Sequence, residues 1–180
     1  TFMNKLDRET RDSLELLDEV ETVLKIRCAP ITWPIGMGKN FRGVYHLIND
    51  EVMLFAPGSE KADQVFEVVK GIDNPLLAEM FPMEMEQLKM EVELVKGASN
   101  PFVLEEFLAG TLTPVFFGSA INNFGVREVL NALLDWAQPP LGRHATVRDV
   151  QPTETAFSGF VFKIQANMDP AHRDRIAFLR

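Results

Sequence analysis

Four residues near the start of the chain, Asn4-Lys5-Leu6-Asp7, carry side chains suited to recognising a base with two adjacent hydrogen-bond donors. They follow Phe2 and Met3, apolar residues typical of a strand end. A carboxylate such as that of Asp7 can accept two neighbouring N–H groups at once, in a charge-assisted bidentate pair. Guanine offers such a pair in its N1–H and N2 amino groups, whereas adenine does not. The four residues therefore predict a guanine-reading loop.

The other polar side chains of this loop suit the remaining parts of a guanine nucleoside. Asn4 can bond the N7 and O6 edge of the base and tie the loop to its neighbours. Lys5 can lay its aliphatic stem over the base plane, with its ammonium near the ribose oxygen. A wrong base would leave Asp7 unpaired, which costs about 1–3 kcal/mol or more for a charged group. Sites built in this way discriminate strongly against the wrong ligand.

A second loop, Phe117-Gly118-Ser119-Ala120, also follows an apolar strand-like run. The backbone N–H of Ala120 could donate to guanine O6, and small residues let the backbone come close to the base. By itself this segment is more simply explained as an ordinary turn before a helix. Its weight comes from the pair of loops, because a parallel sheet would place both at its carboxyl edge.

A phosphate-binding loop is not predicted, although Gly36-Met37-Gly38-Lys39 superficially resembles one. The required pattern is G-x-x-x-x-G-K-[ST]. Trp33 stands where the first glycine belongs, and Asn40 stands where serine or threonine belongs. The three histidines have no metal-ligand spacing, and no catalytic triad is evident. We therefore predict base recognition with no catalytic and no metal-binding residues in this chain.

The bulk properties narrow the class of protein. The net charge of −8 over 180 residues argues against nucleic-acid binding through a broad basic face. Cys28 is the single cysteine, so an internal disulfide is impossible and a reducing cytoplasm is the simplest location. No apolar stretch approaches the roughly 20 residues that span a bilayer, so no membrane partner is predicted.

Hydrophobic periodicity and capping signals predict the elements that must position the two loops. The expected helices span 12–26 with Asp12 as N-cap, 75–80, 83–95 with Gly97 as the residue after its end, a short segment capped by Asn100, and 126–136. The expected strands span 31–35, at a sheet edge because of Pro34, then 44–48, 52–55, 65–69, 113–117, 157–165 and 175–179.

Two charged segments allow more than one interpretation. The acidic helices carry several glutamates and methionines, most simply a solvated face but alternatively a docking surface for a basic partner. These residues are Glu79, Glu84, Glu86, Glu91 and Glu93 with Met80, Met83, Met85 and Met90. The cluster His172-Arg173-Asp174-Arg175 is a polar turn, or a contact with ribosomal RNA or a neighbouring domain.

Over essentially its whole length the chain resembles the bacterial translational GTPases, and most closely the class II peptide chain release factors. The segments that carry the resemblance are 1–8 (TFMNKLDR), 29–36 (APITWPIG), 41–47 (FRGVYHL), 93–100 (ELVKGASN), 114–120 (PVFFGSA) and 159–175 (GFVFKIQANMDPAHRDR). The related translocase, elongation factor G, shares the Pro-Ile-Gly and Phe-Arg-Gly pieces but not the run over 167–175.

The resemblance implies an α/β fold class, namely the C-terminal part of a P-loop-type G domain with an inserted α+β subdomain. The G-domain part would comprise 1–27 and 113–140, and the insertion 28–112. A linker over 141–153 would lead into the first strands of a β-barrel domain over 154–180. The guanine-binding residues would be Asn4, Lys5, Asp7, Ser119 and Ala120.

The resemblance also implies a role on the ribosome. Such factors bind GTP there and help to remove class I release factors after peptide release, so the ribosome and, indirectly, a class I release factor are the expected partners in the cytoplasm. The family's phosphate loop, Mg²⁺-binding switches and catalytic histidine lie before residue 1. We therefore expect an internal fragment of a GTPase that is inactive alone, with GTP or GDP as ligand and Mg²⁺ bound only by the full-length protein. The alternatives are a fragment of an elongation-factor-G-like translocase and a non-catalytic module that docks on a ribosomal stalk protein.

Overall fold

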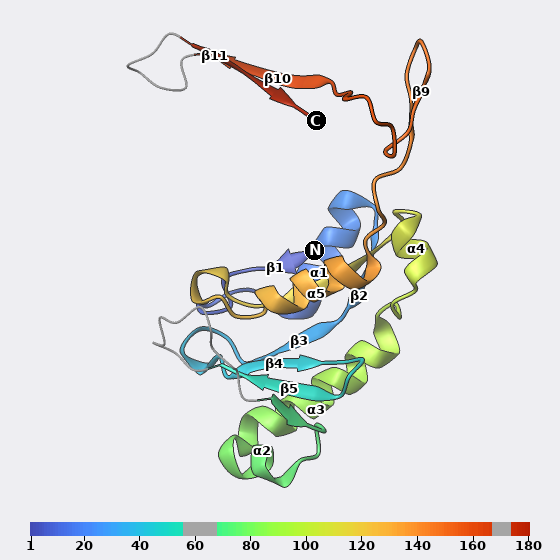
Figure 1. Ribbon diagram of the computed structural model, residues 1–180. Coiled ribbons are helices and arrows are strands. Elements are labelled where there is room, and N and C mark those ends of the chain that lie inside the picture. The colour runs from blue at the N-terminus through green and yellow to red at the C-terminus, as the bar shows by residue number, and fades with distance from the viewer. Residues whose placement is uncertain (56–67, 167–173) are drawn as a thin grey trace. The chain divides into compact units, whose positions relative to one another are not determined.

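The computed structural model describes residues 1–55, 68–166 and 174–180, and it shows a mixed α/β protein (Figure 1). The chain divides into two compact units, Thr1–Ala137 and Gln138–Arg180. Within the described residues the strands form four sheets, two in each unit. The two loops predicted to read a base both lie in the first unit, so most of the positioning elements belong there.

The first sheet of this unit is parallel and has the strand order β1-β7-β2. Its strands are β1 (Phe2–Met3), β7 (Leu112–Phe117) and β2 (Arg27–Pro30). Most residues of β7 are buried, as expected for the central strand of a parallel sheet. Strands β1 and β7, which are far apart in the sequence, thus lie side by side in one sheet. The strand predicted at 113–117 is confirmed as β7.

Helix α1 (Ser13–Leu24) connects β1 to β2 and confirms the predicted helix, with an end two residues earlier than expected. The Asp12 carboxylate accepts from the backbone N–H of Leu14 at 2.8 Å, which makes it the N-cap. The helix ends at Lys25, whose φ of 55° is left-handed. On its inner face Leu17 is buried.

The second sheet is an antiparallel meander of β3 (Thr32–Ile35), β4 (Gly43–His46), β5 (Glu51–Leu54) and β6 (Val68–Lys70), in that order. Strand β3 is its edge, which confirms the position predicted from Pro34. The strands predicted at 44–48 and 52–55 are confirmed as β4 and β5, which form a hairpin with Asp50 at a φ of 54° in the turn and accepting from the Tyr45 hydroxyl at 2.9 Å. The predicted strand at 65–69 is confirmed from Val68 on, while 65–67 lie outside the described residues.

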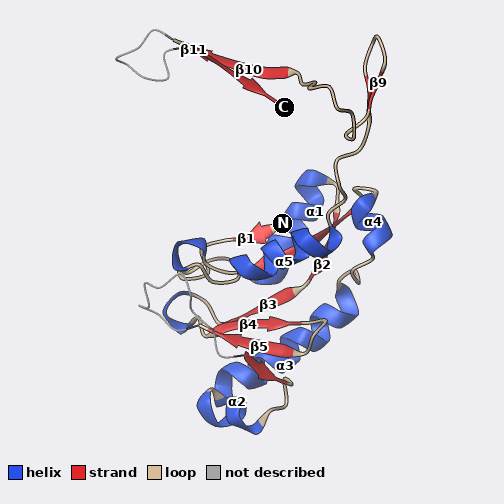
Figure 2. Ribbon diagram, in the orientation of Figure 1, coloured by secondary structure: helices blue, strands red, loops and turns tan. Residues whose placement is uncertain are grey.

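Helices α2 (Pro75–Met80) and α3 (Pro82–Ala98) follow this sheet; Figure 2 distinguishes them from the neighbouring strands β3, β4 and β5. The helix predicted at 83–95 is confirmed as α3, and its buried residues Met85, Leu88, Val92 and Val95 form one apolar stripe at helical spacing. The prediction that Gly97 follows the helix end is wrong. The helix runs through it to Ala98, and Ser99 closes the last turn by donating its N–H to the Val95 carbonyl.

Two glutamates of α3 that were expected on a solvated face have partners in the second sheet. Glu91 accepts from the indole N–H of Trp33 at 2.8 Å. Glu84 accepts from Nε of Arg42 at 3.2 Å. These contacts bind α3 to the sheet, so only the remaining acidic residues of the helix are free to meet a partner.

The prediction that Asn100 caps a helix is also wrong. Helix α4 (Leu104–Leu108) starts later, after Val103, and has no side-chain cap. The Asn100 amide instead donates to Oε1 of Glu21 at 3.0 Å and to the carbonyl of Cys28 at 3.2 Å. A tertiary contact with α1 and β2 therefore takes the side chain that a local pattern assigned to a cap. Helix α5 (Val126–Trp136) has the predicted bounds.

One hydrophobic core joins the two sheets of the first unit. Trp33 of β3 meets Phe117 of β7 edge to face, with ring centroids 5.3 Å apart. Between β2 and β3 only Ile31 intervenes, and it is fully buried. The hydroxyl of Thr32 then accepts from the backbone N–H of Phe117 at 2.9 Å, which extends the hydrogen bonding of β7 where β2 has ended.

The second unit contains two short antiparallel ladders. Strands β8 (Arg143–His144) and β9 (Asp149–Val150) pair within the segment expected to be a linker. Strands β10 (Val161–Ala166) and β11 (Arg175–Leu179) pair with each other; β11 has the predicted bounds, whereas β10 begins four residues later than the predicted 157. Two of the four residues of the charged cluster, 172 and 173, lie outside the described residues. Across the described part of the chain, none of the helices has the length and apolar character needed to traverse a bilayer.

Candidate functional site

The two predicted recognition loops lie side by side because their preceding strands are parallel neighbours. Phe2 of β1 is in register with Phe116 of β7, and both strands run into their loops at the same edge of the sheet. The backbone continues this pairing beyond the strands. The N–H of Gly118 donates to the Met3 carbonyl at 3.0 Å, and the N–H of Leu6 donates back to the Gly118 carbonyl at 3.1 Å. The juxtaposition inferred from the sequence is thus confirmed.

Asn4 links the first loop to the second. Its Oδ1 accepts from the N–H of Lys5 at 2.7 Å and from the N–H of Ala120 at 2.9 Å. Two donors on the oxygen fix which way the amide faces. Among the residues that the structure describes, the Nδ2 group of Asn4 has no hydrogen-bond partner. That donor is the end of the side chain left to bond an acceptor such as guanine N7.

Asp7 is held by a chain of hydrogen bonds from the second loop. The buried Ser119 hydroxyl donates to Oδ1 of Asp7 at 2.5 Å and accepts from Nδ2 of Asn122 at 2.7 Å. The other carboxylate oxygen, Oδ2, lies 4.0 Å from Nε of the exposed Arg8, a weak pairing. Serial hydrogen bonds polarise one another and fix geometry. The carboxylate is therefore anchored at one oxygen and retains acceptor capacity at the other.

The residues between these two side chains have contrasting surroundings. Lys5 is exposed and has a φ of 73°, a left-handed conformation that costs a residue with a Cβ about 1–2 kcal/mol. Leu6 is buried, with 2% of its surface exposed, in the core shared by both sheets. An observed backbone outlier on a ligand-facing loop is a pointer to function. The loop thus has a buried anchor in the middle and polar side chains on either side of it.

Ala120 stands at the start of the short 3-10 helix η2 (Ala120–Asn122) and is exposed. Its N–H, predicted to donate to guanine O6, donates to Asn4 in this structure. A base at this position would therefore share that N–H with Asn4 or displace it. The assignment of Ala120 as a base contact stays a prediction.

The arrangement fits a guanine base in its donor and acceptor set. It offers one anchored carboxylate, one free amide N–H₂ group and one backbone N–H that now donates to Asn4, and the pairing of these groups with guanine stays a prediction. Asn122, which donates to the Ser119 hydroxyl that holds Asp7, was not predicted from the sequence. The only signal for it was its position three residues after Ser119. The Gly36-Met37-Gly38-Lys39 segment leads into the 3-10 helix η1 (Gly38–Asn40) rather than an α-helix. In the described part of the chain no group of three or more His, Cys, Asp or Glu side chains is placed to hold a metal ion.

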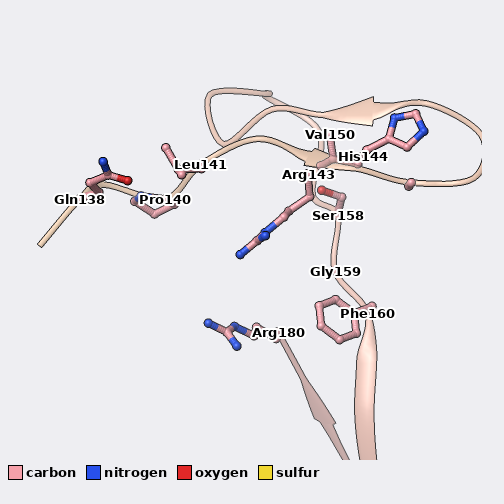
Figure 3. A pocket seen from close by; sticks show the side chains of 11 residues that line it. Gln138, Pro140, Leu141, Arg143, His144, Val150, Ser158, Gly159, Phe160 and Arg180 are labelled. Carbon is pink, nitrogen blue, oxygen red and sulfur yellow. The ribbon is translucent and has the colours of Figure 1, made fainter. Parts of the chain in front are cut away.

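The second unit has a hollow of its own, shown in Figure 3. The guanidinium groups of Arg143 and Arg180 extend toward the same open space, beside the ring of Phe160. Its lining also includes the polar side chains of Gln138, His144 and Ser158. None of the residues predicted to read a base lines this hollow.

Comparison with known proteins identifies the family. No model of a known protein family matches the chain. Among curated proteins, the peptide chain release factor 3 of Aromatoleum aromaticum is 66% identical to it over 185 residues. The alignment covers all of this chain and 34% of the relative, so the chain spans about a third of that protein's length. At this level of identity over its whole length, the chain belongs to a class of translation factors, the release factors. Within that class it is a member of the peptide chain release factor 3 family.

Proposed function

We propose that this chain is the guanine-reading part of a ribosome-associated GTPase that acts in translation termination. In the full-length protein the two loops would select GTP and GDP, and the cycle of GTP binding and hydrolysis would help to remove class I release factors. The observation that carries the proposal is the Asp7 carboxylate, held by Ser119 across two loops at the carboxyl edge of a parallel sheet. Family membership gives this geometry its biological setting.

The proposal assigns a part to each sheet. The parallel sheet with α1 and α5 would be the C-terminal part of a G domain, and the antiparallel sheet with α2 and α3 the subdomain inserted between its two recognition loops. Strands β10 and β11 would begin a β-barrel domain. Phosphates and Mg²⁺ supply most of the affinity for nucleotides in such proteins. Those groups would be held by other parts of the full-length protein.

Competition binding of GDP, IDP and ADP to the full-length protein tests the proposal. Inosine lacks the N2 amino group, so IDP keeps one of the two donors that Asp7 accepts, and ADP keeps neither. We expect affinity to fall in the order GDP, IDP, ADP. Equal affinity for GDP and ADP would refute base recognition by these loops.

A titration of the 180-residue chain with GDP separates recognition from affinity. Base contacts without phosphate contacts should give only feeble binding. Micromolar binding by this chain alone would show that the phosphates need no further residues, and the assignment of phosphate binding to other parts of the protein would then be wrong.

A docking module is the second candidate function, and the surface of α2 and α3 favours it. Large apolar side chains are exposed there beside acidic residues, a pattern that suits an adaptable contact with a basic partner. The exposed residues are Leu76, Met80, Met83, Met90 and Leu94 with Glu79, Glu86 and Glu93. A ribosomal stalk protein is the partner we propose for this surface.

Charge reversal tests the docking candidate. Glu86→Lys with Glu93→Lys changes exposed residues, whereas Glu84 and Glu91 are bound to the sheet and would confuse docking with folding. Ribosome-stimulated GTP hydrolysis by the full-length double variant should fall, with intrinsic nucleotide affinity unchanged. Full stimulation in this variant would count against docking through α3.

A further inference from the structure

The loop over 36–40, which joins β3 to β4, contacts the first recognition loop directly. The backbone N–H of Gly38 donates to the carbonyl of Leu6 at 2.9 Å. Leu6 lies between the two side chains proposed to read the base, and its own N–H donates to Gly118. Both backbone polar groups of Leu6 are therefore fixed, one by the second recognition loop and the other by the antiparallel sheet's loop.

A side chain at residue 38 would be strained by the left-handed backbone and would crowd the backbone of Glu9, whereas the exposed end of the Glu9 side chain can move aside. Gly38 has a φ of +58°, and a Cβ there would lie 2.4 Å from Oε1 of Glu9 and 3.3 Å from the backbone N of Glu9. Gly38 is thus hydrogen-bonded to the recognition loop at Leu6 and lies close to it at Glu9. Asp7 lies on the two-residue arc between these points, so its backbone position follows from where the 36–40 loop lies.

We propose that the 36–40 loop supports the first recognition loop from behind the base-reading site and that Gly38 is a positioning residue for guanine selectivity. It acts through Leu6 and Glu9 on the Asp7 carboxylate and touches no part of the ligand. The two oxygens of a bidentate acceptor must face both donors at once, so a small displacement of Asp7 weakens the pair more than a single hydrogen bond. This inference rests on the proposed function.

A plain structural role for Gly38 would leave a different signature. A glycine with positive φ in a tight loop stabilises the fold whether or not a ligand site is near. Replacing it would then lower the melting temperature and leave selectivity between bases unchanged. The ratio of the Kd for IDP to the Kd for GDP separates the two roles, because it reports the pairing of Asp7 with the N2 amino group.

The experiment compares Gly38→Ala with Gly71→Ala in the full-length protein. Gly71 has a φ of +82° and belongs to the turn after β6, where an added Cβ would have only Oδ2 of Asp50 nearby, at 4.0 Å. Its replacement imposes a similar backbone penalty without contact to the recognition loop. We expect Gly38→Ala to lower the ratio of the IDP Kd to the GDP Kd about tenfold or more, the size of one lost hydrogen bond to a charged acceptor. Gly71→Ala should leave the ratio unchanged.

Hydrogen exchange on the unmodified protein provides a second measurement that does not depend on a variant folding. Binding free energies couple reciprocally, so GDP should slow exchange at the Gly38 amide if that amide helps to hold the site. ADP at the same concentration should not. An unchanged ratio in Gly38→Ala, or no added protection at Gly38 with GDP, would overturn the inference. If the unmodified protein itself fails to prefer GDP over IDP and ADP, the proposed function fails instead.

Discussion

Replacing Asp7 by asparagine should reverse the base preference of the full-length protein while leaving its fold intact. The amide oxygen of the new side chain can still accept from the Ser119 hydroxyl, which now donates to Oδ1 of Asp7 at 2.5 Å. The lost interaction with Arg8 is a long contact of 4.0 Å to an exposed guanidinium, worth little. We therefore expect the free energy of unfolding to change by about 1 kcal/mol or less.

The effect on guanine follows from the two hydrogen bonds that the carboxylate would accept. A hydrogen bond to a charged group contributes about 1.5–3 kcal/mol, so the loss of two amounts to at least about 3 kcal/mol. At about 1.4 kcal/mol for each factor of ten, GDP affinity should fall roughly a hundredfold. Xanthine presents an N1–H donor beside an O2 acceptor, which match the oxygen and nitrogen of an amide. XDP should therefore bind the variant more tightly than GDP does.

Equilibrium competition against a fluorescent nucleotide measures both ligands on the same preparation. Thermal melting of the variant in parallel establishes that it is folded. Retention of guanine preference by a folded Asp7→Asn variant would refute the assignment of this carboxylate to the base. Loss of all nucleotide binding without a gain for XDP would show that the side chain positions the loop rather than contacting the ligand.

Three further predictions concern the first unit. Leu88→Ala in the buried stripe of α3 should cost about 2–5 kcal/mol of unfolding free energy, whereas Leu94→Ala on the exposed face should change it by about 0.5 kcal/mol or less, both measured by denaturant titration. Burial lowers the pKa of His46 below its ordinary 6.5, so as the pH falls the unfolded chain binds a proton at His46 before the folded chain does. The melting temperature should therefore fall as the pH drops below 6.5, and it should fall less in His46→Gln. Burial, with nearby Glu21, raises the pKa of the Cys28 thiol to about 11, so iodoacetamide should label it at neutral pH only after unfolding, as mass spectrometry would detect.

The sequence predicts best where a structure depends on residues close together in the chain. The stripe of Met85, Leu88, Val92 and Val95 follows from helical periodicity, and the Asp12 cap follows from a carboxylate just before an apolar run. The same local signals fail where a distant residue competes. Asn100 resembles a cap, yet its amide bonds Glu21, 79 positions away in the sequence.

The same distinction applies to the candidate site. The types and spacing of Asn4 and Asp7 suffice to suggest base recognition, because that chemistry belongs to individual side chains. The hydrogen bond between Ser119 and Asp7 joins residues 112 positions apart, and the bond from Gly38 to Leu6 joins two separate sheets. No pattern within one segment of the sequence predicts either contact. Both become visible only in the three-dimensional arrangement of the strands.

The short passage from β2 to β3 has a mechanical consequence. The chain leaves one sheet at Pro30 and enters the next at Thr32, with the fully buried Ile31 between them and the Thr32 hydroxyl bonded to β7. Because this route has a single buried connecting residue, we expect the antiparallel sheet to move together with β7, the strand that precedes Ser119. A partner that displaced α3 would then also shift the edge of the parallel sheet that carries the two recognition loops, because no hinge lies between them on this route.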